Sequence, residues 1–176
     1  MRFLPVRHIA LLFCGLLPAA CGSFAGPIVR PPAVSAEAGA MFAPVVMRLH
    51  PLTHLDRTPA GQPIIVCHIE FADSWGDTVK AAGDLAVLLY RPSGAGATGT
   101  QELRWDIELT DPETNAAHYD PATRTYRIQL GRLPEWVAGV GQPGAENQRV
   151  VLRAIFTATD REGRETTLRD ELTVRG

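Results

Sequence analysis

The sequence has little cysteine, almost no lysine and no long charged or apolar run. It holds three Cys and one Lys, Lys80, among 176 residues. No stretch gathers basic residues into a stripe that would contact a phosphate backbone, so nucleic acid is not an expected partner. No apolar run reaches the roughly 20 residues that a membrane-spanning helix needs. Neither a P-loop nor a dinucleotide-binding glycine motif is present, and no cofactor is expected.

A short apolar run near the start of the chain ends in a cysteine. Arg2, Arg7 and His8 precede it, and a basic segment followed by about nine apolar residues is the pattern of a secretory signal peptide. Residues 1–20 are therefore predicted to be a leader. The small residues that come before Cys21 resemble the lipobox of bacterial lipoproteins. That resemblance implies cleavage before Cys21, which would then carry the acyl chains, palmitate among them.

Two alternatives to lipidation stay open. The lipobox usually has Leu three residues before its cysteine, where this chain has Pro18. Cleavage after Ala25 would release a free secreted protein, and an uncleaved leader would itself be an anchor. The cysteine count fits the lipid. Cys14 would leave with the leader, so Cys67 alone would remain in the domain, without a partner for a disulfide.

The rest of the chain divides into a tether and one domain. Residues 21–41 are rich in Gly, Ala, Pro and Ser, which predicts a flexible tether. Residues 42–176 have the length of a single domain. From Cys21 onward the chain has 15 basic and 19 acidic residues, so the predicted mature protein is mildly acidic.

Apolar and polar residues alternate repeatedly within residues 42–176, as they do in strands with one buried face. Residues 85–90 are apolar on both faces, which predicts a central strand. Asp170 falls on the apolar side of its strand, which is typical of an edge strand whose inward charge discourages pairing with other chains. About seven strands predict an all-β fold, an antiparallel β-sandwich that is immunoglobulin-like in the broad sense. The predicted strands lie at residues 45–50, 64–71, 85–90, 102–110, 125–130, 149–158 and 168–174.

Turn and cap residues mark several of the connections. Residues 160–163 read as a tight hairpin turn with Gly163 at its positive-φ position. Residues 120–123 read as a type I turn with Pro121 in second place. Asp111 followed by Pro112 predicts one helical turn over residues 111–118, and residues 133–137 predict another. No segment has the amphipathic pattern of a long helix.

Three segments look like those of uncharacterised bacterial lipoproteins that have a signal, a short tether and one small β domain. They are His-Pro-Leu-Thr-His-Leu-Asp at residues 50–56, Trp-Gly-Asp-Thr-Val-Lys at 75–80, and Trp-Asp-Ile-Glu-Leu-Thr-Asp-Pro-Glu at 105–113. The resemblance implies the same organisation here. It implies no activity, because none is assigned to the group.

The three tryptophans are the candidate binding residues. Trp75 and Trp136 fall in loop-like segments and could form a ligand-binding surface, and the alternative is that they cover the ends of the sandwich. Trp105 lies on the apolar side of its strand and is expected to be largely buried in the core.

No metal site is expected. Pro51 argues against a helix that would put His50 and His54 on one face. The segment that starts at Asp111 lacks the Gly and Glu that an EF-hand loop requires at its sixth and twelfth places. A looser calcium site stays open, with oxygen ligands drawn from Asp73, Asp77, Asp111 or Asp120.

No catalytic residue is assigned, and the chain is not expected to be an enzyme. Cys67 and His68 are adjacent in a predicted strand, so their side chains point to opposite faces and cannot form a thiol–imidazole pair. Cys67 shares a face with Ile65 and Ile69, where an inert buried thiol is expected. No serine lies in a nucleophile elbow.

These observations predict a lipid-anchored protein of the bacterial cell envelope, either periplasmic or surface-exposed, with a freely secreted form as the alternative. Its partners would be the membrane, through the lipid on Cys21, and an envelope protein that the sequence does not identify. A non-enzymatic structural or interaction module is the expected function. The alternative is a β-sandwich that binds carbohydrate, peptide or calcium.

Overall fold

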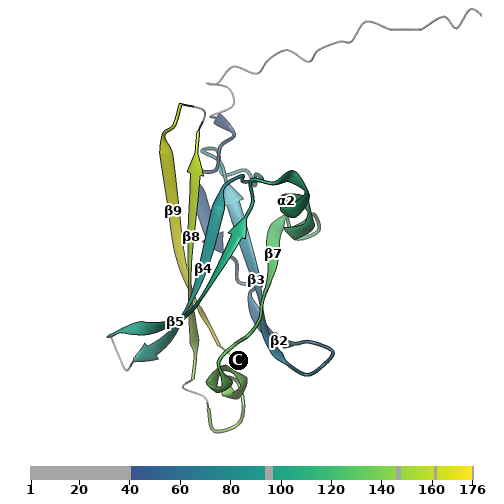
Figure 1. The fold of residues 1–176 in the computed structure, drawn as a ribbon, viewed down its shortest axis with the longest axis vertical. Helices are drawn as coiled ribbons and strands as arrows, with labels where there is room; N and C mark the ends of the chain where they lie inside the picture. Colours follow the sequence, from purple (N-terminus) through teal and green to yellow (C-terminus); the bar gives the residue numbers. More distant parts are fainter. Residues whose placement is uncertain (1–40, 94–96, 146–147, 161, 176) are drawn as a thin grey trace, which may run out of the picture. The chain divides into compact units, whose positions relative to one another are not determined.

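The structure, a computed structural model, describes residues 41–93, 97–145, 148–160 and 162–175. They form two antiparallel sheets packed face to face (Figure 1). The predicted leader, Cys21, the alternative cleavage point at Ala25 and all of the predicted tether except Met41 lie outside the described residues.

The first sheet, sheet A, is built around β3 (Pro63–Ala72). β7 (Thr125–Leu130) pairs with one edge of β3 and carries the two-residue β6 (Tyr119–Asp120) on its far side. β1 (Val46–Leu49) and β2 (His54–Arg57) both pair with the other edge of β3, one after the other. They amount to one edge strand interrupted by a turn at residues 50–53.

The second sheet, sheet B, has the strand order β5-β4-β8-β9. β4 (Asp84–Ser93) lies between β5 (Ala97–Glu108) and β8 (Val150–Thr159), and β9 (Glu165–Val174) is an edge. The apolar strand predicted at residues 85–90 is therefore central, as expected.

The strand order is that of an immunoglobulin-like sandwich. If β1 with β2 is strand A, β3 is B, β7 is E and β6 is D, then sheet A has the order A-B-E-D. Sheet B then has the order C′-C-F-G, with β5 as C′ and β9 as G. The predicted fold class is confirmed. The described residues form nine strands rather than about seven, because strand A is split and β6 is too short to show a pattern.

The core lies between the sheets and is filled by the inward residues of both. Phe71 of β3 makes edge-on ring contacts with Tyr126 of β7, at 5.6 Å between centroids, and with Phe156 of β8, at 4.7 Å. Cys67 is fully buried among these side chains, which confirms its predicted place. Trp105 lies on the predicted inward face of its strand and packs against this core, with part of its surface still exposed. Its strand, β5, is an edge of sheet B, and an edge leaves one flank of an inward side chain uncovered.

A half-buried carboxylate joins the two sheets at one side of the sandwich. Asp170 points inward from β9, and its Oδ2 accepts a 2.7 Å hydrogen bond from the backbone N–H of Leu49 in β1. The two edge strands are thereby joined across the gap between the sheets. β9 is an edge strand with an inward carboxylate, as predicted, and the carboxylate has a backbone partner.

The predicted helical turns and hairpin are present. α2 (Pro112–His118) is capped by Asp111, whose Oδ2 accepts from Thr114 N at 2.8 Å. The second turn is a 3-10 helix, η1 (Glu135–Gly139), two residues later than predicted. The β8–β9 turn is held by Asp160, whose Oδ1 accepts from the N–H groups of Glu162 and Arg164.

Candidate functional site

The two candidate tryptophans lie at opposite ends of the sandwich. Trp75 follows the end of β3, whereas Trp136 follows the end of β7, and these two strands are antiparallel. The structure therefore does not bring Trp75 and Trp136 together into one binding surface. We call the two regions the Trp75 end and the Trp136 end.

Trp75 stands at the tip of a tight turn that is held by hydrogen bonds to Asp73. Asp73 is buried, and its Oδ1 accepts hydrogen bonds from the N–H of Trp75 at 2.9 Å and of Asp77 at 3.0 Å. Gly76 takes a positive φ of 86°, which a residue with a Cβ rarely adopts, and its N–H reaches the carbonyl of Asp73. The turn thus fixes the backbone of Trp75, whose side chain is 56% exposed.

Apolar side chains gather around this tip. The ring of Phe42 lies 5.6 Å from the ring of Trp75, tilted by 54°. Among the described residues, six large hydrophobic side chains are exposed, and all but Leu52 belong to this turn or to the chain just before and within β1. We call this group the Trp75 surface: Met41, Phe42, Val45, Val46 and Trp75. Clusters of exposed apolar side chains mark contacts with proteins or membranes more often than isolated ones do.

The Trp75 end rests on a buried polar clamp. The hydroxyl of Tyr126 lies 3.0 Å from Ala81 N, 3.1 Å from Ala81 O and 2.9 Å from Asn115 Oδ1. The amide of Asn115 also donates to the carbonyls of Ala81 and Leu109. Burial raises the pKa of Tyr126, so its phenol stays protonated. The clamp ties the β3–β4 connection to α2 and holds the base of the Trp75 turn in place.

Trp136 has a structural role at the other end. Its Nε1 donates a 2.6 Å hydrogen bond to Glu102 Oε2, and the guanidinium of Arg91 lies 5.2 Å from its ring centroid. Both partners come from the β4–β5 hairpin. The indole is half-buried and its single donor is used, so Trp136 packs η1 against that hairpin, which was the alternative reading of its sequence position.

The outer face of sheet A carries a group of histidines. The rings of His54 and His68 are stacked with centroids 6.5 Å apart, and His68 Nδ1 lies 2.9 Å from Thr125 Oγ1. His50 and His54 each bond with the backbone of Leu52. Burial lowers the pKa of His68, with further lowering from the charge of Arg127. Among the described residues, no three His, Cys, Asp or Glu side chains are grouped to hold a metal ion.

The carboxylates considered for calcium are committed to local backbone bonds. Asp73 and Asp111 hold a turn and a helix cap, and Asp120 Oδ1 accepts from Ala122 N at 2.9 Å. This bond to the Ala122 N–H lowers the pKa of Asp120, and the bond to the Thr114 N–H lowers that of Asp111. The structure does not bring these three carboxylates and Asp77 together as a ligand set.

Cys67 is inert in this setting. Desolvation by burial raises the pKa of its thiol to about 12, so almost no thiolate exists near neutral pH. His68 belongs to the opposite, outer face of β3, where it meets Thr125. The two side chains therefore do not pair, as the strand geometry predicted.

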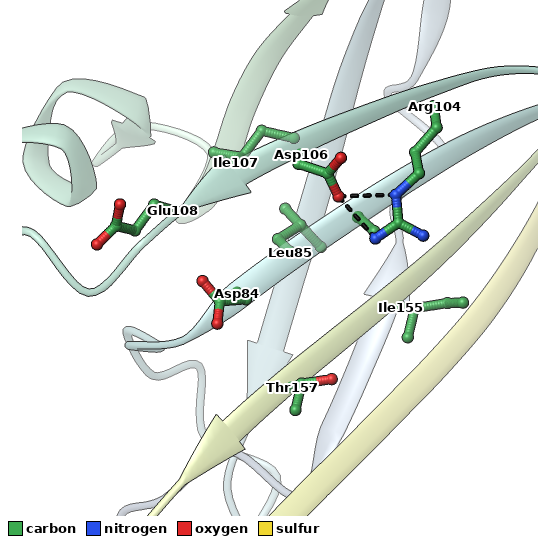
Figure 2. A pocket seen from close by; sticks show the side chains of 9 residues that line it. Asp84, Leu85, Arg104, Asp106, Ile107, Glu108, Ile155 and Thr157 are labelled. Carbon is green, nitrogen blue, oxygen red and sulfur yellow. Dashed lines mark hydrogen bonds and ion pairs between the residues drawn. The ribbon is translucent and has the colours of Figure 1, made fainter.

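A shallow depression lies on the outer face of sheet B (Figure 2). Its volume is about 520 Å3. Asp84 and Glu108, cross-strand partners in β4 and β5, lie at one end, and the ion pair between Arg104 and Asp106, 2.7 Å long, lies at the other (Figure 2). Ala86 supplies a small side chain between them. No sequence pattern pointed to this depression, because it arises where outward residues of three strands meet.

No described helix is long and apolar enough to cross a membrane. No family model, no curated protein and no solved structure matches this chain. The fold and its surfaces are therefore the basis for a functional proposal.

Proposed function

We propose that this chain is a lipid-anchored protein of the bacterial cell envelope, and that its immunoglobulin-like domain is a non-enzymatic interaction module. The observation that supports this most is the order of parts along the chain. A signal-like apolar run, a cysteine at Cys21 and a Gly/Ala/Pro/Ser-rich stretch come before the point where the chain joins the sandwich. The apolar Trp75 surface lies at that same point.

The anchor is tested by following lipid and location together. The wild-type chain, expressed in a bacterial host fed a palmitate analogue, is expected to take up the label and to sediment with membranes. Cys21→Ser is expected to lose both. Cys14→Ala and Cys67→Ala are matched controls, since the first cysteine lies in the predicted leader and the second in the core. Label and membrane association that persist in Cys21→Ser would overturn the anchor.

The second candidate function is ligand binding, and the depression on sheet B favours it. Two carboxylates, Asp84 and Glu108, stand beside an apolar floor that includes Ile155. This chemistry suits a basic side chain of a peptide better than a neutral sugar, and no aromatic ring lines the depression on which a sugar could stack.

A titration followed by NMR separates the two candidates. A lysine-containing oligopeptide is expected to shift the amide signals of β4, β5 and β8 around the depression, and Asp84→Asn to weaken that shift. The same titration with neutral oligosaccharide or with calcium serves as the comparison. Signals that stay in place with every probe would leave the interaction module as the better account and contradict ligand binding at this face.

A further inference from the structure

We propose that the Trp75 surface docks onto the headgroup region of the bilayer that holds the anchor, and that a zwitterionic surface is its preferred target. The inference rests on the proposed lipid on Cys21. It adds an orientation: the Trp75 end faces the membrane, and the Trp136 end and both outer sheet faces stay in solution.

The Trp75 surface lies where the chain from the proposed anchor enters the domain. Val45 N donates to Ala72 O at 2.9 Å, so the chain joins sheet A beside the Trp75 turn. A flexible segment with the length of the predicted tether, residues 21–41, has a root-mean-square span of about 25 Å. β3 has 10 residues, so the other end of the sandwich lies about 30 Å farther along the strand direction. An anchor on Cys21 therefore keeps the Trp75 end, and not the Trp136 end, within reach of the bilayer.

The side chains of the Trp75 surface are suited to the membrane–water interface. Trp and Phe are amphipathic or apolar rings that favour the membrane–water interface, where an indole can bury its body and keep its N–H wet. Trp75 and Phe42 are 56% and 61% exposed, so both rings still have most of their surface in water. The Asp73 turn already fixes the backbone of Trp75. Docking therefore loses little conformational entropy, and attachment through the lipid raises the effective concentration of the bilayer at this surface.

The charges around the surface select the kind of lipid. Acidic residues outnumber basic ones in the connections of this end whose side chains are described. The acids are Asp73, Asp77, Asp111, Glu113, Asp160 and Glu162, and the bases are Lys80, Arg124 and Arg164. An anionic leaflet attracts basic segments and repels acidic ones. Phosphatidylethanolamine or phosphatidylcholine thus fits this end better than phosphatidylglycerol does.

The test is quenching of tryptophan emission by brominated lipid. The full lipidated chain is reconstituted in phosphatidylethanolamine vesicles that contain phosphatidylcholine brominated near the headgroup end of its acyl chains. Emission of the wild-type chain is expected to fall, and Trp75→Phe, which keeps a ring at the tip, is expected to lose that quenching. Trp136→Phe is the matched control and is expected to keep it. Replacing part of the phosphatidylethanolamine by phosphatidylglycerol is expected to reduce the quenching.

Co-flotation with the vesicles separates the two proposals. A chain that floats but is not quenched, or that is quenched equally in Trp75→Phe, overturns the docking while the anchor stands. A chain that does not float overturns both. Quenching that grows with phosphatidylglycerol overturns the preference for a zwitterionic surface.

Discussion

The two ends of the sandwich use their tryptophans in opposite ways. At the Trp136 end, the indole donates to Glu102 and lies under Arg91, so its polar and apolar parts are both used within the fold. At the Trp75 end, the turn is held by Asp73 and Gly76 and leaves the indole exposed beside Phe42. An aromatic residue in a loop is thus a packing element in one place and a free surface in the other. The neighbouring side chains decide which.

The largest stability effect is expected at neither end, but in the sheet between them. Trp105→Ala removes a half-buried indole that packs against the core and donates to Gly131 O at 3.2 Å. The expected loss is about 3 kcal/mol, the lower part of the range for Trp-to-Ala changes in a core. Denaturant unfolding gives the value. A loss below about 1 kcal/mol would mean that the packing of β5 contributes little.

The next largest effect separates the two ends. Trp136→Ala removes the contacts with Glu102 and Arg91 and is expected to cost about 2 kcal/mol. Trp75→Ala, its counterpart, is expected to change the free energy of unfolding by less than about 1 kcal/mol, because the side chain is mostly in water already. Equal losses in the free energy of unfolding for the two variants would contradict the proposed difference between the two ends.

A smaller effect concerns pH and is expected at the outer face of sheet A rather than at either end. The pKa of His68 is lowered by burial, then by the charges of Arg127, His54 and His50, while Asp120 opposes the shift. The folded protein therefore binds fewer protons at His68 than the unfolded chain does. This contribution to stability is complete above pH 6.5 and is lost as the pH falls below 6.5.

His68→Gln is expected to flatten the pH dependence of unfolding below pH 6.5, the ordinary pKa of a histidine. Denaturant midpoints measured across this interval for the wild type and for His68→Gln give the two slopes. An unchanged slope in His68→Gln would show that His68 titrates normally in the folded protein.

The smallest expected effect is the slow alkylation of the Cys67 thiol in the folded domain. This low reactivity allows cysteines introduced at either end to be labelled selectively. With a pKa of about 12 and no exposed surface, Cys67 is expected to resist alkylation in the folded domain and to react readily once the domain is unfolded. Mass spectrometry after a brief exposure to iodoacetamide gives the extent of labelling. Rapid labelling of the folded protein would contradict the buried position of Cys67.

Period-two alternation was sufficient to predict the buried faces of most strands, because every second residue of a strand with one buried face is apolar. It could not show that residues 54–57 are a strand. Their side chains are mostly exposed. These residues form a strand because their backbone pairs with β3. Alternation gave the inward face of Trp105 correctly, but not the remaining exposure of its side chain, since alternation gives the face of a residue and not the position of its strand in the sheet.

The candidate site was predicted in part. Trp75 was singled out because its segment reads as a loop, and its exposure fits that. Its partner Phe42 had no signal in the sequence, because the two rings meet only once the start of β1 lies beside the end of β3. Trp136 has a loop-like sequence as well, but partners on the β4–β5 hairpin take up its indole.

The most direct test of the difference between the ends is the membrane depth of a spin label at each. Because Cys67 is buried and Cys21 would be acylated, a new cysteine at Ser74 or at Glu135 can be labelled alone in the anchored full chain. In a phosphatidylethanolamine bilayer, the label at Ser74 is expected to collide more with oxygen and less with a water-soluble nickel complex than the label at Glu135. Equal collision rates at the two ends would contradict the account.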